Sequence, residues 1–171
     1  LSEIGITGQK HLKASSVLCV GSGGFGSPIL LYLAAAGIGN IGIVDFDCVE
    51  DSNLQRQVLY GMSWIGKPKI DSARARILEI NPHCQVDTFR TRLSSENALD
   101  IIKRFDIVCD CTDNFPSRYL INDACVILGK PNIYGSVSRF EGQATVFNLN
   151  KESPNYRDLF PSPLPPEMTP S

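Results

Sequence analysis

The feature that most constrains this fold is a glycine-rich turn placed directly between an apolar run and a helical pattern. The apolar run is Val17–Val20, the turn is Gly21–Gly26 with the spacing Gly-x-Gly-x-x-Gly, and the helical pattern continues to Ala36. Glycines in such a turn let a ligand phosphate approach the backbone, and the helix that follows offers free N–H groups to an anion. The order strand, glycine turn, helix therefore predicts a nucleotide-binding βα unit.

Apolar runs and helical patterns keep alternating along the chain, which predicts a mostly parallel sheet with helices on both faces. We expect strands at 17–20, 41–45, 86–89, 105–110, 131–134 and 144–149. Helices are expected at 26–36 (ended by Gly37), 67–80, from a cap at Ser94 or Ser95 to Lys103, and at 116–128 (ended by Gly129). The predicted class is a Rossmann-like α/β fold.

The length of 171 residues suits one domain. Residues 1–150 are expected to form the Rossmann-like nucleotide-binding domain, and the proline-rich residues 151–171 a loop or linker. We expect part of that stretch, 154–171, to cross over the active site and to become ordered only with partners. The chain begins at Leu1 rather than Met and ends in a proline-rich run, so we also expect a fold truncated in its C-terminal part.

Charge and cysteine content exclude several classes of protein. A net charge of −2 counts against nucleic-acid and membrane-surface binding, and no secretory signal or membrane-spanning stretch is present in the sequence. Six cysteines without a Cys-x-x-Cys motif favour reduced, mostly buried thiols in a cytoplasmic protein. The only histidines, His11 and His83, have no partner at zinc-ligand spacing and are expected at the surface.

Polar residues follow the predicted strands at the edge where ligands bind in open α/β sheets. Asp45 comes nineteen residues after Gly26 and is expected to accept hydrogen bonds from ribose hydroxyls. Two cations and a carboxylate at this edge suit a triphosphate with Mg²⁺. The residues concerned are Ser52, Asn53 and Arg56, then Lys69, then Asp113 and Asn114.

An NAD-dependent oxidoreductase is the alternative that shares the glycine turn and Asp45. A dinucleotide needs no metal and few cations, and neither histidine is placed to serve as the acid or base of hydride transfer. This alternative is therefore kept, but it is not favoured.

Seven short motifs occur in order and together resemble the MoeB/ThiF family, relatives of ubiquitin-activating enzymes. They are Val20–Gly26, Val44–Asp47, Ser52–Gln57, Gly66–Lys69, Asn81–Pro82, Asp110–Asn114 and Glu141–Gln143. The resemblance implies an adenylyltransferase that uses Mg-ATP to activate the C-terminal glycine carboxylate of a small ubiquitin-like sulfur carrier, with release of pyrophosphate. Sulfur then passes to the carrier, giving a thiocarboxylate for molybdopterin or thiazole synthesis.

The same resemblance assigns roles by position. The glycines of the turn would contact the nucleotide, Asp45 its ribose, and Asp113 the Mg²⁺ ion. Arg56, Lys69 and Asp113 would carry catalysis. The full expected nucleotide site is Gly21, Gly23, Gly24, Gly26, Asp45, Ser52, Asn53, Arg56, Lys69, Asp113 and Asn114.

Three departures from the family pattern affect what is expected. An arginine segment that precedes the region of Gly5 in relatives, and serves the neighbouring subunit of a dimer, lies outside this sequence. The first Cys-x-x-Cys pair of a zinc site is replaced by Asn155–Asp158, so no structural zinc is expected. A cysteine that receives carrier or sulfur in relatives lies just beyond the position of Ser171. The resemblance also implies a homodimer and a sulfurtransferase partner or fused domain.

Four readings of the function stay open beside the oxidoreductase. A MoaD-like carrier for molybdopterin synthesis is favoured, and a ThiS carrier for thiamine synthesis is the alternative. A sister family modifies tRNA or peptides by the same chemistry. The inactive half of a heterodimeric activating enzyme is disfavoured, because Asp45, Arg56, Lys69 and Asp113 are all present.

Overall fold

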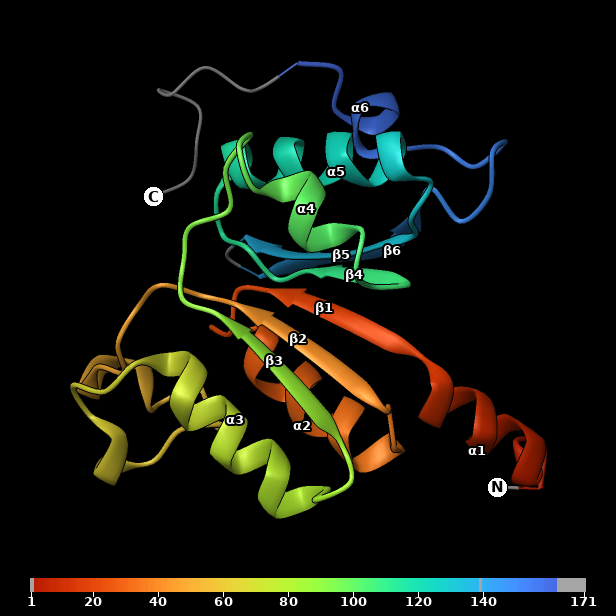
Figure 1. The fold of residues 1–171 in the computed structure, drawn as a ribbon. Helices are drawn as coiled ribbons and strands as arrows, with labels where there is room; N and C mark the ends of the chain where they lie inside the picture. Colours follow the sequence, from red (N-terminus) through yellow and green to blue (C-terminus); the bar gives the residue numbers. More distant parts are fainter. Residues whose placement is uncertain (1, 139, 163–171) are drawn as a thin grey trace.

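One twisted six-stranded sheet forms the centre of the computed structural model, which describes residues 2–138 and 140–162 (Figure 1). The strand order is β3-β2-β1-β4-β5-β6; β1 to β5 run parallel, and β6 is antiparallel to β5. The bounds are β1 Ser16–Val20, β2 Asn40–Val44, β3 Gln85–Phe89, β4 Ile107–Asp110, β5 Asn132–Ser138 and β6 Glu141–Phe147. The predicted mostly parallel sheet is confirmed.

Helices cover both faces of this sheet, as predicted. Figure 1 shows α2 and α3 against β1 to β3, and α4 and α5 on the opposite side over β4 to β6. The bounds are α1 Gly5–Ala14, α2 Gly26–Ala36, α3 Lys69–Ile80, α4 Ala98–Ile102, α5 Phe115–Leu128 and α6 Tyr156–Leu159, with 3-10 turns η1 Asp51–Asn53 and η2 Met62–Trp64. No helix in the described part of the chain is long and apolar enough to cross a membrane.

The central strand β1 joins the two layers of the core. Its side chains alternate between the faces of the sheet, since successive residues of a strand point in opposite directions. Val17 and Cys19 belong to the cluster formed with α2 and α3. Leu18 and Val20 belong to the cluster formed with α4 and α5. Because β2 and β4 lie on either side of β1, the connections diverge here, and ligands bind at this switch point in open α/β sheets.

Two helix starts differ from the expectation. The helix predicted from Lys67 begins at Lys69, because Pro68 has an extended backbone with ψ 134°. The cap predicted at Ser94 or Ser95 is wrong, since α4 begins only at Ala98. The Asn97 side chain accepts a hydrogen bond from the Ser94 N–H at 2.9 Å, so the intervening residues form a turn instead of helix.

The two strands expected at 131–134 and 144–149 form a longer hairpin. They pair in register from Asn132 opposite Phe147 to Ser138 opposite Glu141. Asn148, with φ 54°, ends β6 two residues earlier than predicted. Helix α1 has no counterpart in the expectation, and no residue of it is buried.

Part of the proline-rich segment, residues 154–162, packs against the rest of the chain. Tyr156, in α6, is 1% exposed and packs in a cluster with Tyr119, Tyr134 and Phe147. The expectation that the segment is ordered only with partners is therefore wrong for residues 154–162. Residues 163–171 lie outside the described part of the chain.

Candidate functional site

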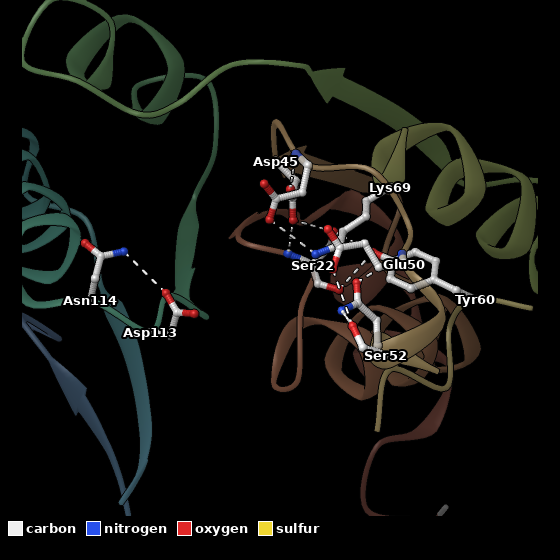
Figure 2. A network of polar contacts seen from close by, with 10 residues as sticks. Ser22, Asp45, Glu50, Ser52, Tyr60, Lys69, Asp113 and Asn114 are labelled. Atoms are coloured by element: carbon white, nitrogen blue, oxygen red, sulfur yellow. Dashed lines mark hydrogen bonds and ion pairs between the residues drawn. The ribbon is translucent and has the colours of Figure 1, made fainter. Parts of the chain in front are cut away.

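A cleft of about 840 Å³ opens at the carboxyl ends of β1, β2 and β4. One side, the glycine wall, is formed by the turn Gly21–Phe25 together with residues between Asp45 and Lys69. The other side, the α5 wall, is formed by Cys111–Asn114 and the first turn of α5. Figure 2 shows Asp113 and Asn114 on the α5 wall, facing the group around Asp45 and Lys69.

The glycines of the turn serve two different purposes. Gly21 has φ 91°, and a Cβ on Gly26 would lie 2.1 Å from the Gly21 carbonyl oxygen, so both are required by the packing of the turn. A Cβ on Gly23 or Gly24 would meet no protein atom closer than 3.7 Å. The absence of side chains at Gly23 and Gly24 therefore leaves open space in the cleft. Gly26 does not line the cleft, although it was predicted as a contact residue.

Asp45 fixes the turn from the end of β2, and the residue is 7% exposed at the edge of the cleft. Its Oδ2 accepts hydrogen bonds from Ser22 N at 2.8 Å and Ser22 Oγ at 2.6 Å, and its Oδ1 accepts one from Asp47 N at 2.9 Å (Figure 2). Tyr60 Oη donates to the Ser22 carbonyl at 2.8 Å, and burial raises the pKa of Tyr60, so the phenol stays a donor. Each carboxylate oxygen accepts up to two hydrogen bonds, so Oδ1 retains one acceptor position.

Lys69 is held at the first position of α3. Its side chain is 8% exposed, and its Nζ lies 3.3 Å from Asp47 Oδ2, while the Asp47 side chain is half exposed. An ammonium group has three donors, of which Asp47 takes one. Lys69 therefore presents a positive charge to the cleft with donors to spare.

Arg56 and Asn53 lie on the 3-10 turn η1 and just after it. The Asn53 side chain is largely used locally, because its Oδ1 accepts from Glu50 N at 3.3 Å in a capping box. Arg56 is exposed, and its Nη1 donates only to the Ser52 carbonyl at 3.4 Å; in residues 2–138 and 140–162 it forms no ion pair. Ser52 is exposed outside the cleft, 3.4 Å from Glu50 Oε2.

Asp113 and Asn114 are exposed at the start of the α5 wall. Asn114 caps α5, with its Oδ1 accepting from Ser117 N at 3.0 Å. Asp113 Oδ1 accepts a 3.4 Å hydrogen bond from Asn114 Nδ2 (Figure 2). The preceding turn is fixed by Asp110 Oδ1, which accepts from Thr112 N and Oγ1. Asp113 thus presents a carboxylate with free acceptor positions to the cleft.

The donor set fits a magnesium ion only in company with a phosphate. Among the described residues, no group of three or more His, Cys, Asp or Glu side chains gathers as a metal site. Mg²⁺ is usually bound by one or two carboxylates together with substrate phosphates. Asp113 could supply one such carboxylate, and Gly23 and Gly24 leave open space for phosphates in the same cleft.

Phe46, Arg92 and Arg118 are among the cleft residues that sequence reasoning missed. The Arg92 guanidinium stacks on the Phe46 ring at 4.5 Å, and Phe46 is 46% exposed. Arg118 lies on the α5 wall. It follows the capping residue Asn114 by four positions, which is about one helical turn, so the cap signal could have located it. Nothing in the sequence around Arg92 marks it.

The thiols are placed as predicted. All six cysteines are free, and all except Cys48 are buried. Cys19 and Cys109 lie opposite each other in β1 and β4. Contact with the thiols of Cys109 and Cys111, together with burial, raises the pKa of Cys19 well above its ordinary value. His11 and His83 are both exposed, as expected.

Comparison with known proteins gives long matches. The chain is 55% identical over 167 residues to an adenylyltransferase and sulfurtransferase MOCS3 of Culex quinquefasciatus, covering 98% of this chain and 38% of that protein. It is 50% identical over 175 residues to a sulfur carrier protein adenylyltransferase of Thermus thermophilus, covering 100% of this chain and 65% of that protein. The chain thus spans less than two thirds of the length of these curated relatives.

A solved structure has the same architecture. The crystal structure of Escherichia coli MccB with MccA-N7isoASN superposes with a TM-score of 0.81 at 26% identity, over 87% of this chain and 44% of that one. The match to the ThiF family runs over residues 1–171, the whole sequence. Sequence, fold and length of match agree, and the chain belongs to the ThiF family.

Proposed function

We propose that this chain is the nucleotide-binding part of an adenylyltransferase that activates the C-terminal carboxylate of a small ubiquitin-like sulfur carrier with Mg-ATP. The observation that carries the proposal is the pairing of the two walls of the cleft. Side-chain-free space at Gly23 and Gly24 adjoins the cations Arg56 and Lys69, and the carboxylate of Asp113 faces them. The names of the MOCS3 and Thermus relatives support the same chemistry.

The reaction needs positioning and charge neutralisation more than a protein nucleophile. A carboxylate oxygen of the carrier forms a bond to the α-phosphorus of ATP, the bond to the bridging oxygen breaks, and pyrophosphate leaves with the electron pair. Both reactants are anions, so fixed cations in the cleft lower the barrier. In this chain Arg56 supplies a planar fork for phosphate oxygens and Lys69 a point charge.

Asp45 and Asp113 have distinct roles in this proposal. Asp45 fixes the glycine turn through Ser22 and accepts a ribose hydroxyl with the remaining position on Oδ1. Asp113 would bind Mg²⁺, which supplies charge neutralisation at the phosphates when it is present. Phe46, which stacks with Arg92, gives the base end of the nucleotide an aromatic surface.

The decisive measurement is carrier-dependent ATP–pyrophosphate exchange by the full-length protein, with MoaD-type and ThiS-type carriers offered in parallel. We expect exchange with a MoaD-type carrier, in keeping with a step of molybdopterin synthesis. Arg56→Ala and Asp113→Ala should each lower exchange by at least about a hundredfold. Arg76→Ala is the matched control, because Arg76 is exposed on α3 and pairs with Glu79. Near-normal exchange in both site variants would refute the site assignment.

The rival functions are separated by simple additions to that experiment. Exchange with ThiS alone would transfer the proposal to thiamine synthesis. Exchange driven by a peptide or a tRNA, and by neither carrier, would indicate the sister chemistry. Tight binding of NAD without any exchange would favour the oxidoreductase, although no histidine of the described chain lines the cleft to serve its chemistry.

The assembly proposed for the whole protein follows the same relatives. We propose a homodimer located in the cytoplasm, with a sulfurtransferase partner or fused domain that delivers sulfur after adenylation. Free, mostly buried thiols support a reducing compartment. Sedimentation of the full-length protein would test the dimer directly.

A further inference from the structure

Arg118 is a cation of the cleft that the proposed chemistry has not yet used. It lies one turn into α5 and lines the α5 wall, whereas Arg56 and Lys69 belong to the glycine wall. In the described part of the chain, no carboxylate lies within ion-pair distance of its guanidinium. A partly buried guanidinium without a counterion is costly, so this position calls for an anion from outside the chain.

The guanidinium is fixed in place before any ligand arrives. Nη1 donates to Tyr134 Oη at 3.2 Å, and Nη2 donates to the Thr112 carbonyl at 3.3 Å. Its centre lies 5.5 Å from the Phe115 ring and 5.3 Å from the Tyr134 ring. Two neutral acceptors and two rings hold the group without cancelling its charge. Each terminal nitrogen carries two protons, so one on each stays free.

Asp110 is an internal carboxylate whose charge acts on Arg118, but among the described residues the two form no ion pair. Asp110 is buried at the end of β4, and its Oδ1 is taken by Thr112 N and Oγ1. Its Oδ2 has no hydrogen-bond partner, and neither has Nε of Arg118. Burial raises the pKa of Asp110, although hydrogen bonds from Thr112 and the charge of Arg118 act in the opposite direction.

The surroundings of Arg118 suit the end of a peptide. Val137, on the adjoining hairpin, lines the same cleft and is 63% exposed. Gly135, two residues earlier, lacks a side chain beside the Phe25 ring, which a Cβ would approach to 3.7 Å. The surface that leads to the fixed guanidinium is apolar and has few side chains. Such a surface fits an extended peptide that ends in a carboxylate. The phosphate-binding features, by contrast, gather on the glycine wall.

We propose that Arg118 binds the C-terminal carboxylate of the carrier and holds it opposite the α-phosphate. This inference rests on the proposed function and names the residue that recognises the acceptor substrate. The parallel N–H groups of a guanidinium match the two oxygens of a carboxylate. Because the guanidinium of Arg118 is always protonated and is already held in place, its charge offsets the repulsion between the carrier carboxylate and the α-phosphate. Tyr134 acts as a positioning residue, since its hydroxyl orients Nη1.

The test compares one carrier in two chemical forms. A MoaD-type carrier ending in a glycine carboxylate and the same carrier ending in a glycine carboxamide are titrated into the full-length protein with a non-hydrolysable ATP analogue and Mg²⁺. We expect the wild type to prefer the carboxylate by at least about tenfold. Arg118→Ala should lower this ratio to about one, with ATP-analogue affinity changed less than about threefold. Arg118→Lys should give an intermediate ratio, and Arg76→Ala the wild-type ratio.

The ratio separates recognition from folding, because a loss of folded protein lowers binding of both carriers equally. If Arg118→Ala does not fold, Tyr134→Phe keeps the ring, removes the hydroxyl and should still lower the ratio. An unchanged ratio in Arg118→Lys and Tyr134→Phe, or a loss of ATP affinity with the ratio intact, would overturn the inference and leave the proposed function standing. A wild type that binds neither carrier and shows no exchange would overturn both.

Discussion

At the scale of single residues, neighbouring glycines of one motif have opposite requirements. Gly26 is needed because a methyl group there would collide with the backbone oxygen of Gly21. Gly24 has no such neighbour, since the nearest atom to a Cβ would be Arg56 Nε at 3.9 Å. The packing of the turn requires Gly26, whereas Gly24 leaves open space in the cleft.

This difference can be measured with two alanine variants. Gly24→Ala should unfold at the wild-type temperature or slightly above it, because alanine restricts the unfolded chain by about 0.4–1 kcal/mol. Its ATP affinity should fall by at least about tenfold, since the methyl group occupies phosphate space. Gly26→Ala should instead lose more than about 2 kcal/mol of stability, because the added methyl group clashes with the Gly21 carbonyl oxygen. Thermal unfolding and ATP titration check both, and normal ATP binding by Gly24→Ala would place the phosphates elsewhere.

Asp110 gives a prediction about pH. Burial raises its folded-state pKa above the ordinary value of 3.8. A carboxyl with a raised folded pKa favours folding at pH values below its unfolded pKa, and this contribution is lost as the pH rises through the folded pKa. Asp110→Asn keeps an acceptor for Thr112 and removes the buried charge. We expect the variant to melt above the wild type at pH 7, with the difference shrinking as the pH falls toward 3.8.

The control for this measurement is Asp100→Asn. A hydrogen bond from Lys103 lowers the pKa of Asp100, so its contribution to stability is present above its unfolded pKa and declines as the pH falls through the lowered value. The two variants should therefore show opposite trends in melting temperature against pH. A pH-independent difference for Asp110→Asn would contradict the argument.

The sequence predicted which residues lie together in the cleft more accurately than it predicted their hydrogen-bond partners. Asp45, Lys69 and Asp113 meet at one cleft because the carboxyl ends of parallel strands share an edge. That the Asp45 carboxylate is largely occupied by Ser22 and Asp47 depends on side-chain geometry, which no spacing encodes.

At the scale of elements, α6 shows how tertiary contacts stabilise a helix too short to stand alone. Asn155 and Asp158 form a reciprocal capping box, so the side chains that replace a Cys-x-x-Cys pair bond across the first turn. The buried Asn122 accepts from Tyr156 N at 2.7 Å, and Arg157 forms an ion pair with Asp123 on α5 at 2.7 Å. The expectation that the protein binds no structural zinc stays a prediction, which a metal analysis can test.

Two substitutions on α5 should rank these contacts. Asn122→Ala leaves the amide of Tyr156 without its buried acceptor and should cost about 1–3 kcal/mol. Asp123→Ala removes a partly exposed ion pair and should cost less than about 1 kcal/mol. Hydrogen exchange at the α6 amides should rise strongly in the first variant and little in the second. Equal effects would show that the ion pair, rather than Asn122, docks α6.

The elements that sequence reasoning missed share one property. Helix α6 has only four residues, which is too short to show a helical repeat of apolar residues. No residue of α1 is buried, so its sequence has no apolar face that would mark it as a helix. Helix α2 was predicted to the residue because a glycine turn precedes it and Gly37, with φ 89°, ends it. Clear start and stop signals therefore located a helix in the sequence better than its length did.

At the scale of the whole molecule, the sheet order determines where chemistry can occur. Alternating patterns predicted the parallel sheet and helices on both faces, but the order of strands follows from packing rather than from any local signal. With β1 at the centre, the glycine turn after it faces the loop after β4, and the two walls of the cleft come from segments far apart in the sequence.

The central position of β1 also affects how the chain is made. Its first partner in register, Ile43 opposite Cys19, follows 24 residues later, whereas its second, Cys109, follows 90 residues later. At ribosomal rates of about 5–20 residues per second, that second edge stays open for roughly 5–18 s during synthesis. Throughout this interval one edge of β1 lacks its backbone partners in β4, and an unpaired strand edge favours aggregation of a partly folded chain.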